Sequence, residues 1–471
     1  NVGIPTLGRA FDASTTQLQW IVDAYTLVFA VLMLPGGYLG DRVGRRKILI
    51  TGLLGFAVVS SVSAMTTHIT VLIGLRVLLG ICAALVFPAT LSLISTIFKG
   101  TKHHALAVGL WAATAGLGIA LGPVVGGLLL EHFEWPSLFW INIVIVLPVA
   151  GISSFLVPES RSNKLGRFDA VGMCLAIAAL GLFVGSIIEG PQLGWTTLPV
   201  LGGLATSILL AGAFMAWEKR VDSPMLDLSL FRASNVATCS SAIGLAFFSL
   251  FGFTFTITIY FQAVRGYSAL QAGLAILPFA VVMGACSPLA PVLARRFGTG
   301  RCVPFGIALM GIGFWIVSFA DATNSYWAVM VPAMIFMAMG LAFAQGPATD
   351  IILSAAPSDE IGVASGVNDS IREIGGTIGV AVLGSILTHV YRDQMSTVTS
   401  TSPSLSAAGD SIMAAQQIAA TLPEGSQQTT LRTTASDAFL SALHINCLIL
   451  TGIMLMASIL IAFRFVHNAR H

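Results

Sequence analysis

The stretch GGYLGDRVGRRKIL, residues 36–49, places one acid and four bases between two long apolar segments. Charges at this density are excluded from bilayer hydrocarbon, so the loop predicts a membrane-spanning helix on either side of it. A positive cluster of this kind is typical of a cytoplasmic loop that sets topology. A second interpretation stays open: Asp41 beside Arg42, among glycines that permit close backbone approach, suits a latch whose ion pairs form and break in a rocking motion.

The composition of the whole chain supports a membrane protein. Of 471 residues, 56% are hydrophobic and 9% are charged, against roughly 25% charged in soluble domains. A membrane-crossing helix needs about 20 mostly apolar residues. The sequence predicts thirteen complete spans, centred near residues 29, 56, 82, 118, 146, 179, 208, 248, 280, 311, 335, 375 and 454. The opening residues NVGIPTLGRAF are expected to be the outer end of a truncated fourteenth span.

The distribution of basic residues supports this topology. If Asn1 lies at the outer side, seventeen of the 23 Lys and Arg residues fall in inner loops, four in outer loops and two within spans. This asymmetry follows the positive-inside rule. The six cysteines all lie within predicted spans without a metal-ligand or disulfide pattern, and we interpret them as packing residues.

A weak internal repeat suggests how the spans are grouped. YLGDRVG at 38–44 and VLARRFG at 292–298 match at an offset of 254 residues, with Arg295 in place of Asp41. The repeat predicts a six-helix unit at 1–157, two additional helices at 158–220 and a second unit at 221–471. Parallel repeats of this type place the substrate path between the units, near the midplane. For the polar outer segment 391–438, we favour a linker over a short surface helix.

A second charged stretch lies inside an apolar span. GVASGVNDSIREIGGTIGVAVLGSIL, residues 362–387, contains Asp369, Arg372 and Glu373, where each ionised group costs several kcal/mol unless it is paired or functional. At 1.5 Å per residue from residue 361, Asp369 lies about 12 Å deep and Glu373 about 18 Å deep. The two acids share a helix face, and their repulsion and desolvation favour one of them holding a proton near neutral pH, which Arg372 opposes. The alternative is a static ion cluster that fixes helix packing, although the glycines that follow argue against a rigid strut.

Two further charged residues and a glycine-rich span are candidates. Arg76 lies about 9 Å below the outer end of its span and either faces the interior or extends towards the surface. Asp23 lies just inside the outer edge of its span, where an interfacial acid is the simpler interpretation. In the span near residue 118, three glycines recur every four residues and offer a flat packing face, and a proline among them can bend the helix; these residues are Gly118, Gly122, Gly126 and Pro123.

Several motifs in order resemble the major facilitator superfamily, in its fourteen-span drug:proton antiporter branch. They are GYLGDRVGRRKIL, LRVLLGICAAL with Arg76, GIALGPVVGG from Gly118 to Gly127, WPSLFWIN, FDAVG, GYSALQAGLAILP and ASGVNDSIREIGGTIGVAVLGSI. The resemblance covers the whole chain. It implies an all-α polytopic membrane protein of two six-helix bundles plus two central helices, fourteen spans in all with the first truncated.

The resemblance also implies roles for residues. Its quaternary-ammonium exporters carry acids at the positions of Asn368, Asp369 and Glu373, so the Asn368 departure puts dicationic substrates in doubt. Asp23, Arg76 and Arg372 are expected to join Asp369, Glu373 and Asn368 in handling protons or substrate. Gating is expected to involve Asp41, Arg42, Arg45, Arg46, Gly118, Gly122, Pro123, Gly126 and Gly127.

The expected function is therefore proton-coupled export of amphipathic or cationic small molecules by a monomer in the bacterial cytoplasmic (inner) membrane. The expected partners are the substrate, protons and membrane lipids, with no cofactor and no nucleic acid. The chain contains no GxxxxGK[ST] loop for ATP hydrolysis, and we expect a transporter rather than an enzyme. The main alternative is an exporter of lipids or cell-envelope precursors on the same fold. An importer and a non-transporting membrane sensor are weaker alternatives.

Overall fold

The computed structural model describes residues 2–98, 101, 118, 121–161, 169–221, 224, 234–355, 361–401, 403–423 and 425–468. These residues form helices and no strand, and twelve of the helices are long and apolar enough to cross a membrane. The all-α membrane fold is confirmed. The predicted count of fourteen spans is not confirmed: the span near residue 118 falls largely outside the described residues, and the opening residues form only the short helix α1 (Ile4–Phe11).

The first bundle contains the N-terminal spans. It comprises α2 (Thr15–Val43), α3 (Arg45–Met65), α4 (Ile69–Ile97), helical residues 121–132 and α6 (Ser137–Leu156). Helix α2 begins with a capping box, because the Ser14 hydroxyl accepts from the Gln17 amide while the Gln17 side chain accepts from the Ser14 amide. It ends at Gly44, whose φ of 127° reverses the chain directly into α3.

The second bundle repeats this pattern with more breaks. It comprises α9 (Ser234–Ile259) with its continuation η2 (Tyr260–Val264), α10 (Ala269–Leu274), α11 (Leu277–Cys286), α12 (Leu289–Phe297), α13 (Thr299–Val317), α14 (Tyr326–Ser354), α15 (Ile361–Thr401) and α17 (Ser426–Asn468). The turn from α12 to α13 passes through Gly298, with φ of 85°. It corresponds to Gly44 in the internal repeat, so both repeat loops turn on a glycine that a side chain would strain.

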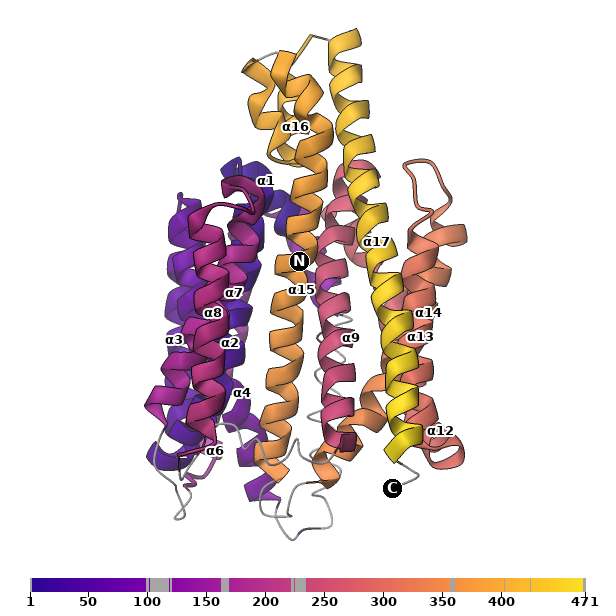
Figure 1. Cartoon of the computed structure of the whole chain (residues 1–471). Helices are drawn as coiled ribbons and strands as arrows, with labels where there is room; N and C mark the ends of the chain where they lie inside the picture. Colours follow the sequence, from indigo (N-terminus) through magenta and orange to yellow (C-terminus); the bar gives the residue numbers. More distant parts are fainter. Residues whose placement is uncertain are drawn as a thin grey trace.

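The middle pair, α7 (Ala170–Leu193) and α8 (Leu198–Glu218), packs beside the seam between α2 and α15 (Figure 1). The Ser385 hydroxyl on α15 donates to the Ile187 carbonyl on α7 at 2.6 Å. On the other side of the seam, the Trp20 indole of α2 donates to Glu189 at 2.8 Å. Helix α7 therefore contacts both bundles, and α8 packs on α7.

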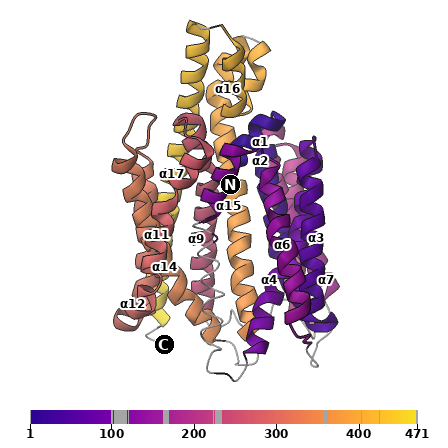
Figure 2. The same cartoon turned by 180° about the vertical axis from the view of Figure 1, so that it is seen from behind.

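The prediction of a linker at 391–438 is wrong. Helices α15 and α17 have 41 and 43 residues, about twice the length that a bilayer requires. Their outer turns, together with η3 (Pro403–Gly409) and α16 (Ile412–Thr421), form an outer cap that projects beyond the other helices (Figures 1 and 2). Ser411 caps α16, and apolar residues of α16 are buried in the main hydrophobic core, among them Ile412, Met413 and Ala415. This burial stabilises helix where composition alone favoured a flexible chain.

Candidate functional site

The intramembrane charges predicted on α15 form an ordered cluster with α14 and α9. Asp369 and Arg372 make an ion pair at 3.4 Å, with side chains 14% and 22% exposed. The Arg372 guanidinium also donates to the Thr349 hydroxyl of α14 at 3.3 Å and lies 5.3 Å from the centre of the Phe247 ring of α9. Arg372 is therefore held by three helices of the second bundle.

Asn368 extends the same polar contact. The Thr349 hydroxyl, which accepts from Arg372, donates to the Asn368 amide oxygen at 3.5 Å. Asn368 is 2% exposed. The residue that replaces a family acid is thus a buried link between α14 and α15.

Glu373 lies four residues after Asp369 on α15. Its carboxylate has no basic group within 4.0 Å among the described residues. Across the bundle interface, Tyr25 of α2 lies within electrostatic range of both Glu373 and Arg76. Asp369 is thus paired with Arg372, while Glu373 lies within electrostatic range of Asp369 and Arg372 and of Tyr25 in the first bundle.

Arg76 points into the protein and does not extend towards the outer surface. Its Nε donates to the Ile21 carbonyl of α2 at 2.8 Å, and its Cζ lies 4.4 Å from the centre of the Tyr25 ring. This stacking is a cation–π contact. Arg76 makes no ion pair within the described part of the chain.

Asp23 is completely buried, and neither of its carboxylate oxygens has a hydrogen-bond partner among the described residues. Asp23 is therefore not a solvent-exposed acid at the membrane–water interface, which was the simpler interpretation of the sequence. One turn outward on the same face of α2, the Gln19 amide donates to the Val380 and Ala381 carbonyls of α15 at 3.3 and 3.1 Å. Because α2 and α15 are antiparallel, this register places Asp23 level with Thr377, one turn outward of Glu373.

Sequence reasoning did not select Gln19, Tyr25 or Thr349. A signal existed for Gln19, because an amide four residues from Asp23 in an apolar helix must find partners across a helix interface. No comparable signal marked Thr349, whose importance depends entirely on its place opposite α15.

The glycines of α15 serve close packing against α9. A Cβ at Gly375 would lie 2.3 Å from the Gly244 carbonyl oxygen, and one at Gly379 would lie 2.0 Å from that of Phe248. Both distances are too short for any side chain, so these glycines let the two backbones touch. They therefore give no evidence against a fixed ion cluster, contrary to our expectation.

The inner loop after α2 makes its ion pairs within the first bundle. Asp41 pairs with Arg45 at 2.7 Å, four residues further along the chain. Arg45 also donates to the Ser92 carbonyl near the inner end of α4 at 3.4 Å. Arg46 lies 4.0 Å from the Glu159 carboxylate, which accepts from the Arg46 amide at 3.1 Å.

Only part of the predicted glycine face in residues 118–127 makes close contacts. A Cβ at Gly127 would lie 2.6 Å from Leu270 Cα of α10, and one at Gly273 of α10 would lie 2.3 Å from the Pro123 carbonyl oxygen. The described residues place no atom within 4 Å of a Cβ at Gly118 or Gly122, and Gly126 meets only Leu138 at 3.8 Å. The contact between the bundles thus involves the Pro123 and Gly127 side of this helix.

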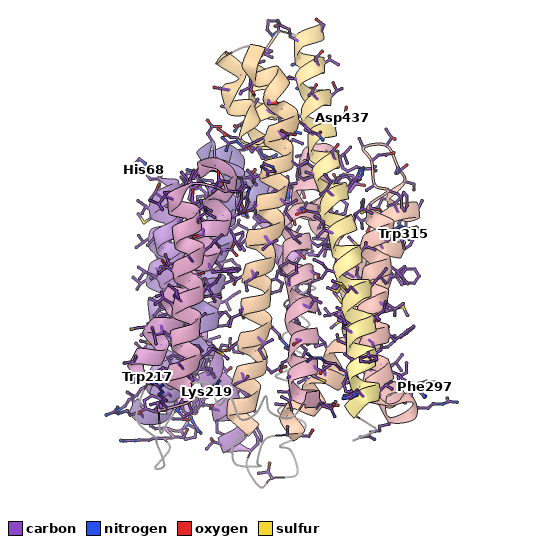
Figure 3. The ribbon with its side chains drawn as sticks, in the orientation of Figure 1. His68, Trp217, Lys219, Phe297, Trp315 and Asp437 are labelled. Atoms are coloured by element: carbon purple, nitrogen blue, oxygen red, sulfur yellow. The ribbon has the colours of Figure 1, made fainter. Side chains whose placement is uncertain are left out.

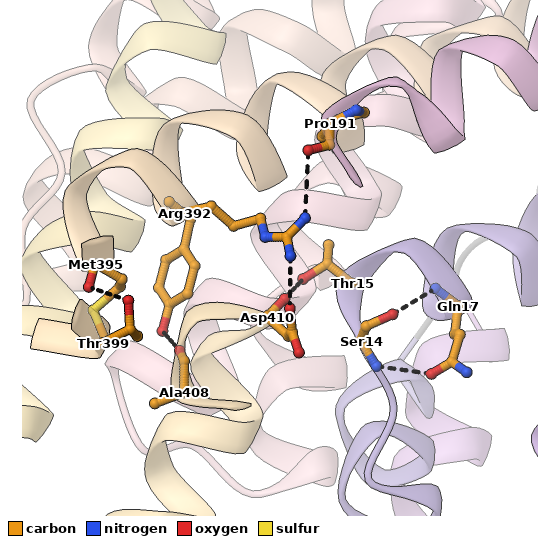
Figure 4. Close-up of polar contacts among 10 residues, drawn as sticks. Ser14, Thr15, Gln17, Pro191, Arg392, Met395, Thr399, Ala408 and Asp410 are labelled. Atoms are coloured by element: carbon orange, nitrogen blue, oxygen red, sulfur yellow. Dashed lines mark hydrogen bonds and ion pairs between the residues drawn. The ribbon is translucent and has the colours of Figure 1, made fainter. Parts of the chain in front are cut away.

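Polar contacts also close the outer ends of the bundles (Figure 4). Arg392 of α15 pairs with Asp410 at 3.1 Å and donates to the Pro191 carbonyl of α7 at 3.3 Å. The Thr15 hydroxyl at the start of α2 donates to the Asp410 carbonyl at 3.3 Å. The outer cap is therefore connected to the first bundle and to the middle pair.

Comparisons with known proteins agree with this architecture. A family model described as "Major Facilitator Superfamily" matches residues 1–380. The chain is 34% identical over 463 residues to the multidrug efflux pump LfrA of Mycolicibacterium smegmatis, covering 98% of this chain and 91% of LfrA. It is also 34% identical to the methyl viologen resistance protein SmvA of Salmonella typhimurium, covering 83% of this chain and 79% of SmvA.

Solved structures support the fold alone. The POT family transporter PepTSo has a TM-score of 0.64 at 16% identity, covering 100% of this chain and 95% of that one. A bacterial homologue of the human lysosomal transporter Spinster also has a TM-score of 0.64, at 14% identity, covering 99% of this chain and 93% of its own. Together with the apolar helices, these findings show a multi-pass transporter of the bacterial inner membrane and not an enzyme. The chain belongs to the Major Facilitator Superfamily.

Proposed function

We propose that the chain exports amphipathic or cationic small molecules in exchange for protons. The observation that carries this proposal is a set of acids at the bundle interface, of which Asp23 is fully buried and Glu373 is half-buried. Asp23 and Glu373 lie on facing helices, and among the described residues neither is in an ion pair, while Asp369 is paired with Arg372. Carboxylates inside a membrane are costly unless a proton or a cation neutralises them.

The geometry favours competition between a proton and a substrate. With a proton on Glu373, the site is neutral and has little attraction for a cation. Once the proton leaves towards the inner side, the carboxylate attracts a positively charged substrate, and rocking of the bundles then exposes it outside. A proton entering from outside displaces the substrate and resets the cycle. The names of LfrA and SmvA support drug export and give no support to the envelope-lipid alternative.

The proposed topology has fourteen spans, with twelve in the described residues, one near residue 118 and one ending in α1. The proposed gates are the inner loop, with Asp41, Arg42, Arg45 and Arg46, and the outer contact at Pro123 and Gly127. We also propose that the protein transports its substrate as a monomer.

The test is proton flux in liposomes that contain a pH-sensitive dye, after addition of a fluorescent organic cation such as ethidium. We expect Glu373→Gln and Asp23→Asn each to lower substrate-triggered flux by about tenfold, in line with usual coupling energies. Asp437→Asn is the matched control, because Asp437 lies exposed on the outer part of α17, far from the bundle interface (Figure 3). Normal flux in both interface variants would contradict the proposal.

A further inference from the structure

The two repeat loops differ in charge at their equivalent positions. In the first loop, Asp41 neutralises Arg45, and Glu159 lies beside Arg46. In the second loop, at the offset of 254 residues, Arg295 replaces Asp41, Arg296 and Arg301 stand where the first loop has Arg42 and Lys47, and no acid lies between residues 289 and 320. The repeat thus keeps its glycine turn but loses its acidic partner.

Four arginines gather at the inner rim of the second bundle, and all are exposed: Arg295, Arg296, Arg301 and Arg464. Gly300 at the start of α13 packs so closely on α17 that a Cβ there would lie 3.0 Å from Phe465 Cβ. This contact brings the residues beside it, Arg301 and Arg464, to the same level. Among the described residues, none of the four arginines lies within 4.0 Å of a carboxylate oxygen.

In the first repeat, the glycine turn at Gly44 lies against a carboxylate. A Cβ at Gly44 would lie 2.7 Å from the Glu159 carboxylate, which accepts from the backbone amide of Arg46 in the first turn of α3. At Gly298, the described residues place no atom within 4 Å of the corresponding Cβ. The first turn of α13 therefore offers backbone amides, at the positive end of a helix, beside three arginines instead of an internal carboxylate.

Large exposed apolar side chains lie among the arginines of this basic patch. Phe297 is 50% exposed, Phe463 70% and Val466 55%, and Phe297 lies at the inner rim near the end of α12 (Figure 3). The Arg296 Cζ lies 5.5 Å from the centre of the Phe297 ring. Helix α12 packs on α13, which in turn packs on α17, so α12 and the inner end of α17 lie at the same end of the second bundle (Figures 1 and 2). The arginines are thus interspersed with exposed apolar surface, a combination typical of the membrane–water interface.

We propose that the basic patch formed by Arg295, Arg296, Arg301 and Arg464 binds the headgroup phosphate of an anionic phospholipid in the inner leaflet. Basic pockets between spans on the cytoplasmic side recognise such headgroups by charge. A free phosphate ion has the same charged chemistry but gains nothing from Phe297, Phe463 and Val466, so the apolar surroundings favour the lipid. The inference does not depend on the transported substrate or on proton coupling.

The test is native mass spectrometry of the purified chain with phosphatidylglycerol or phosphatidylcholine added in detergent. We expect the wild type to retain phosphatidylglycerol in preference to phosphatidylcholine. The triple variant Arg295→Gln, Arg301→Gln, Arg464→Gln should bind phosphatidylglycerol about a hundredfold more weakly, at about fivefold per arginine. Inorganic phosphate in excess should displace little of the bound lipid; complete displacement would identify a simple anion site and overturn the lipid assignment.

The matched control removes three exposed positive charges from the same side of the membrane, with Lys47→Gln, Lys219→Gln and Arg220→Gln. If the patch is a specific site, this variant retains phosphatidylglycerol like the wild type. Equal loss in both triple variants would show that only overall charge matters, and unchanged binding in the first variant would exclude the patch. A thermal unfolding curve for each variant, measured without added lipid, separates loss of binding from loss of folding.

Discussion

At the residue scale, the position of each charge relative to its neighbours decides what it does. Asp369 and Glu373 are one helical turn apart on α15, yet Asp369 makes the ion pair with Arg372, whereas Glu373 lies within electrostatic range of both Arg372 and Tyr25 of α2. Arg76 stacks on Tyr25 and makes no ion pair within the described residues, so it leaves Glu373 without a fixed basic partner. An acid held in this way is suited to exchange one cation for another.

Gln19 provides a prediction at this scale, because its amide alone donates from α2 to the Val380 and Ala381 carbonyls. Gln19→Glu keeps the shape, removes both donors and directs an ionised carboxylate at two carbonyl oxygens. We expect the outer ends of α2 and α15 to separate, with about a thirtyfold gain in the ratio of open to closed molecules, since two hydrogen bonds contribute about 1 kcal/mol each. Pulsed electron paramagnetic resonance between spin labels on the two helices measures the separation.

The control is Gln17→Glu on the same helix, because the Gln17 side chain caps α2 locally through Ser14 and makes no hydrogen bond to α15 among the described residues. If Gln19→Glu gives the same distance distribution as Gln17→Glu, the amide does not hold the outer ends together. Repeating the measurement at a pH low enough to protonate the new carboxyl should restore part of the closed population.

At the element scale, sequence periodicity predicted the membrane helices well and their neighbours poorly. Composition was sufficient to place α15 in the membrane with its charges inside. It was not sufficient for Asp41, whose partner is one turn away at Arg45 because Gly44 reverses the chain there. Nor did it predict α16, because the polar outer segment becomes helical only by burying Ile412 and Met413 against the rest of the protein. Contacts between distant segments decide such features.

The close contact between α9 and α15 provides the prediction for this scale. Gly379→Ala would place a methyl group 2.0 Å from the Phe248 carbonyl oxygen, so the two helices must move apart. We expect a loss of about 1–3 kcal/mol in the free energy of unfolding, the usual cost of overpacking. Thermal unfolding in detergent measures it. Gly452→Ala on α17 is the control, since its Cβ would meet no atom within 4 Å; equal destabilisation in both variants would show that the seam tolerates a side chain.

At the scale of the whole molecule, the structure is closed at its outer side. The outer cap contacts α1 through the Gln417 amide, which donates to the Arg9 carbonyl at 2.8 Å. It contacts η2 through the Gln416 amide, which donates to the Ala263 carbonyl. Away from the outer cap, Gly127 and Gly273 let the helix at 121–132 of the first bundle pack closely on α10 of the second bundle. The internal repeat predicted two similar units, but it did not predict that an additional segment within the second unit would join them.

Replacement of residues 403–423 by a short Gly-Ser linker tests this arrangement. We expect the bundles to separate more readily at the outer side, because the contacts made by Asp410, Gln416 and Gln417 are lost. Spin labels at positions 68 and 322, in two outer loops, should move apart. Labels at positions 219 and 297, at the inner rim, should move closer. Unchanged distances at both levels would mean that the outer cap has no effect on which side is open.

The continuity of α15 has a consequence for access from outside the cell. This single helix of 41 residues is about 60 Å long at 1.5 Å per residue. It joins Glu373, in the middle of the membrane, to Arg392 and the outer cap without a described break. An antibody fragment that recognises the outer cap therefore binds the same continuous helix that carries Asp369 and Glu373. It can hold the transporter in one conformation without crossing the bilayer and without resembling any transported compound.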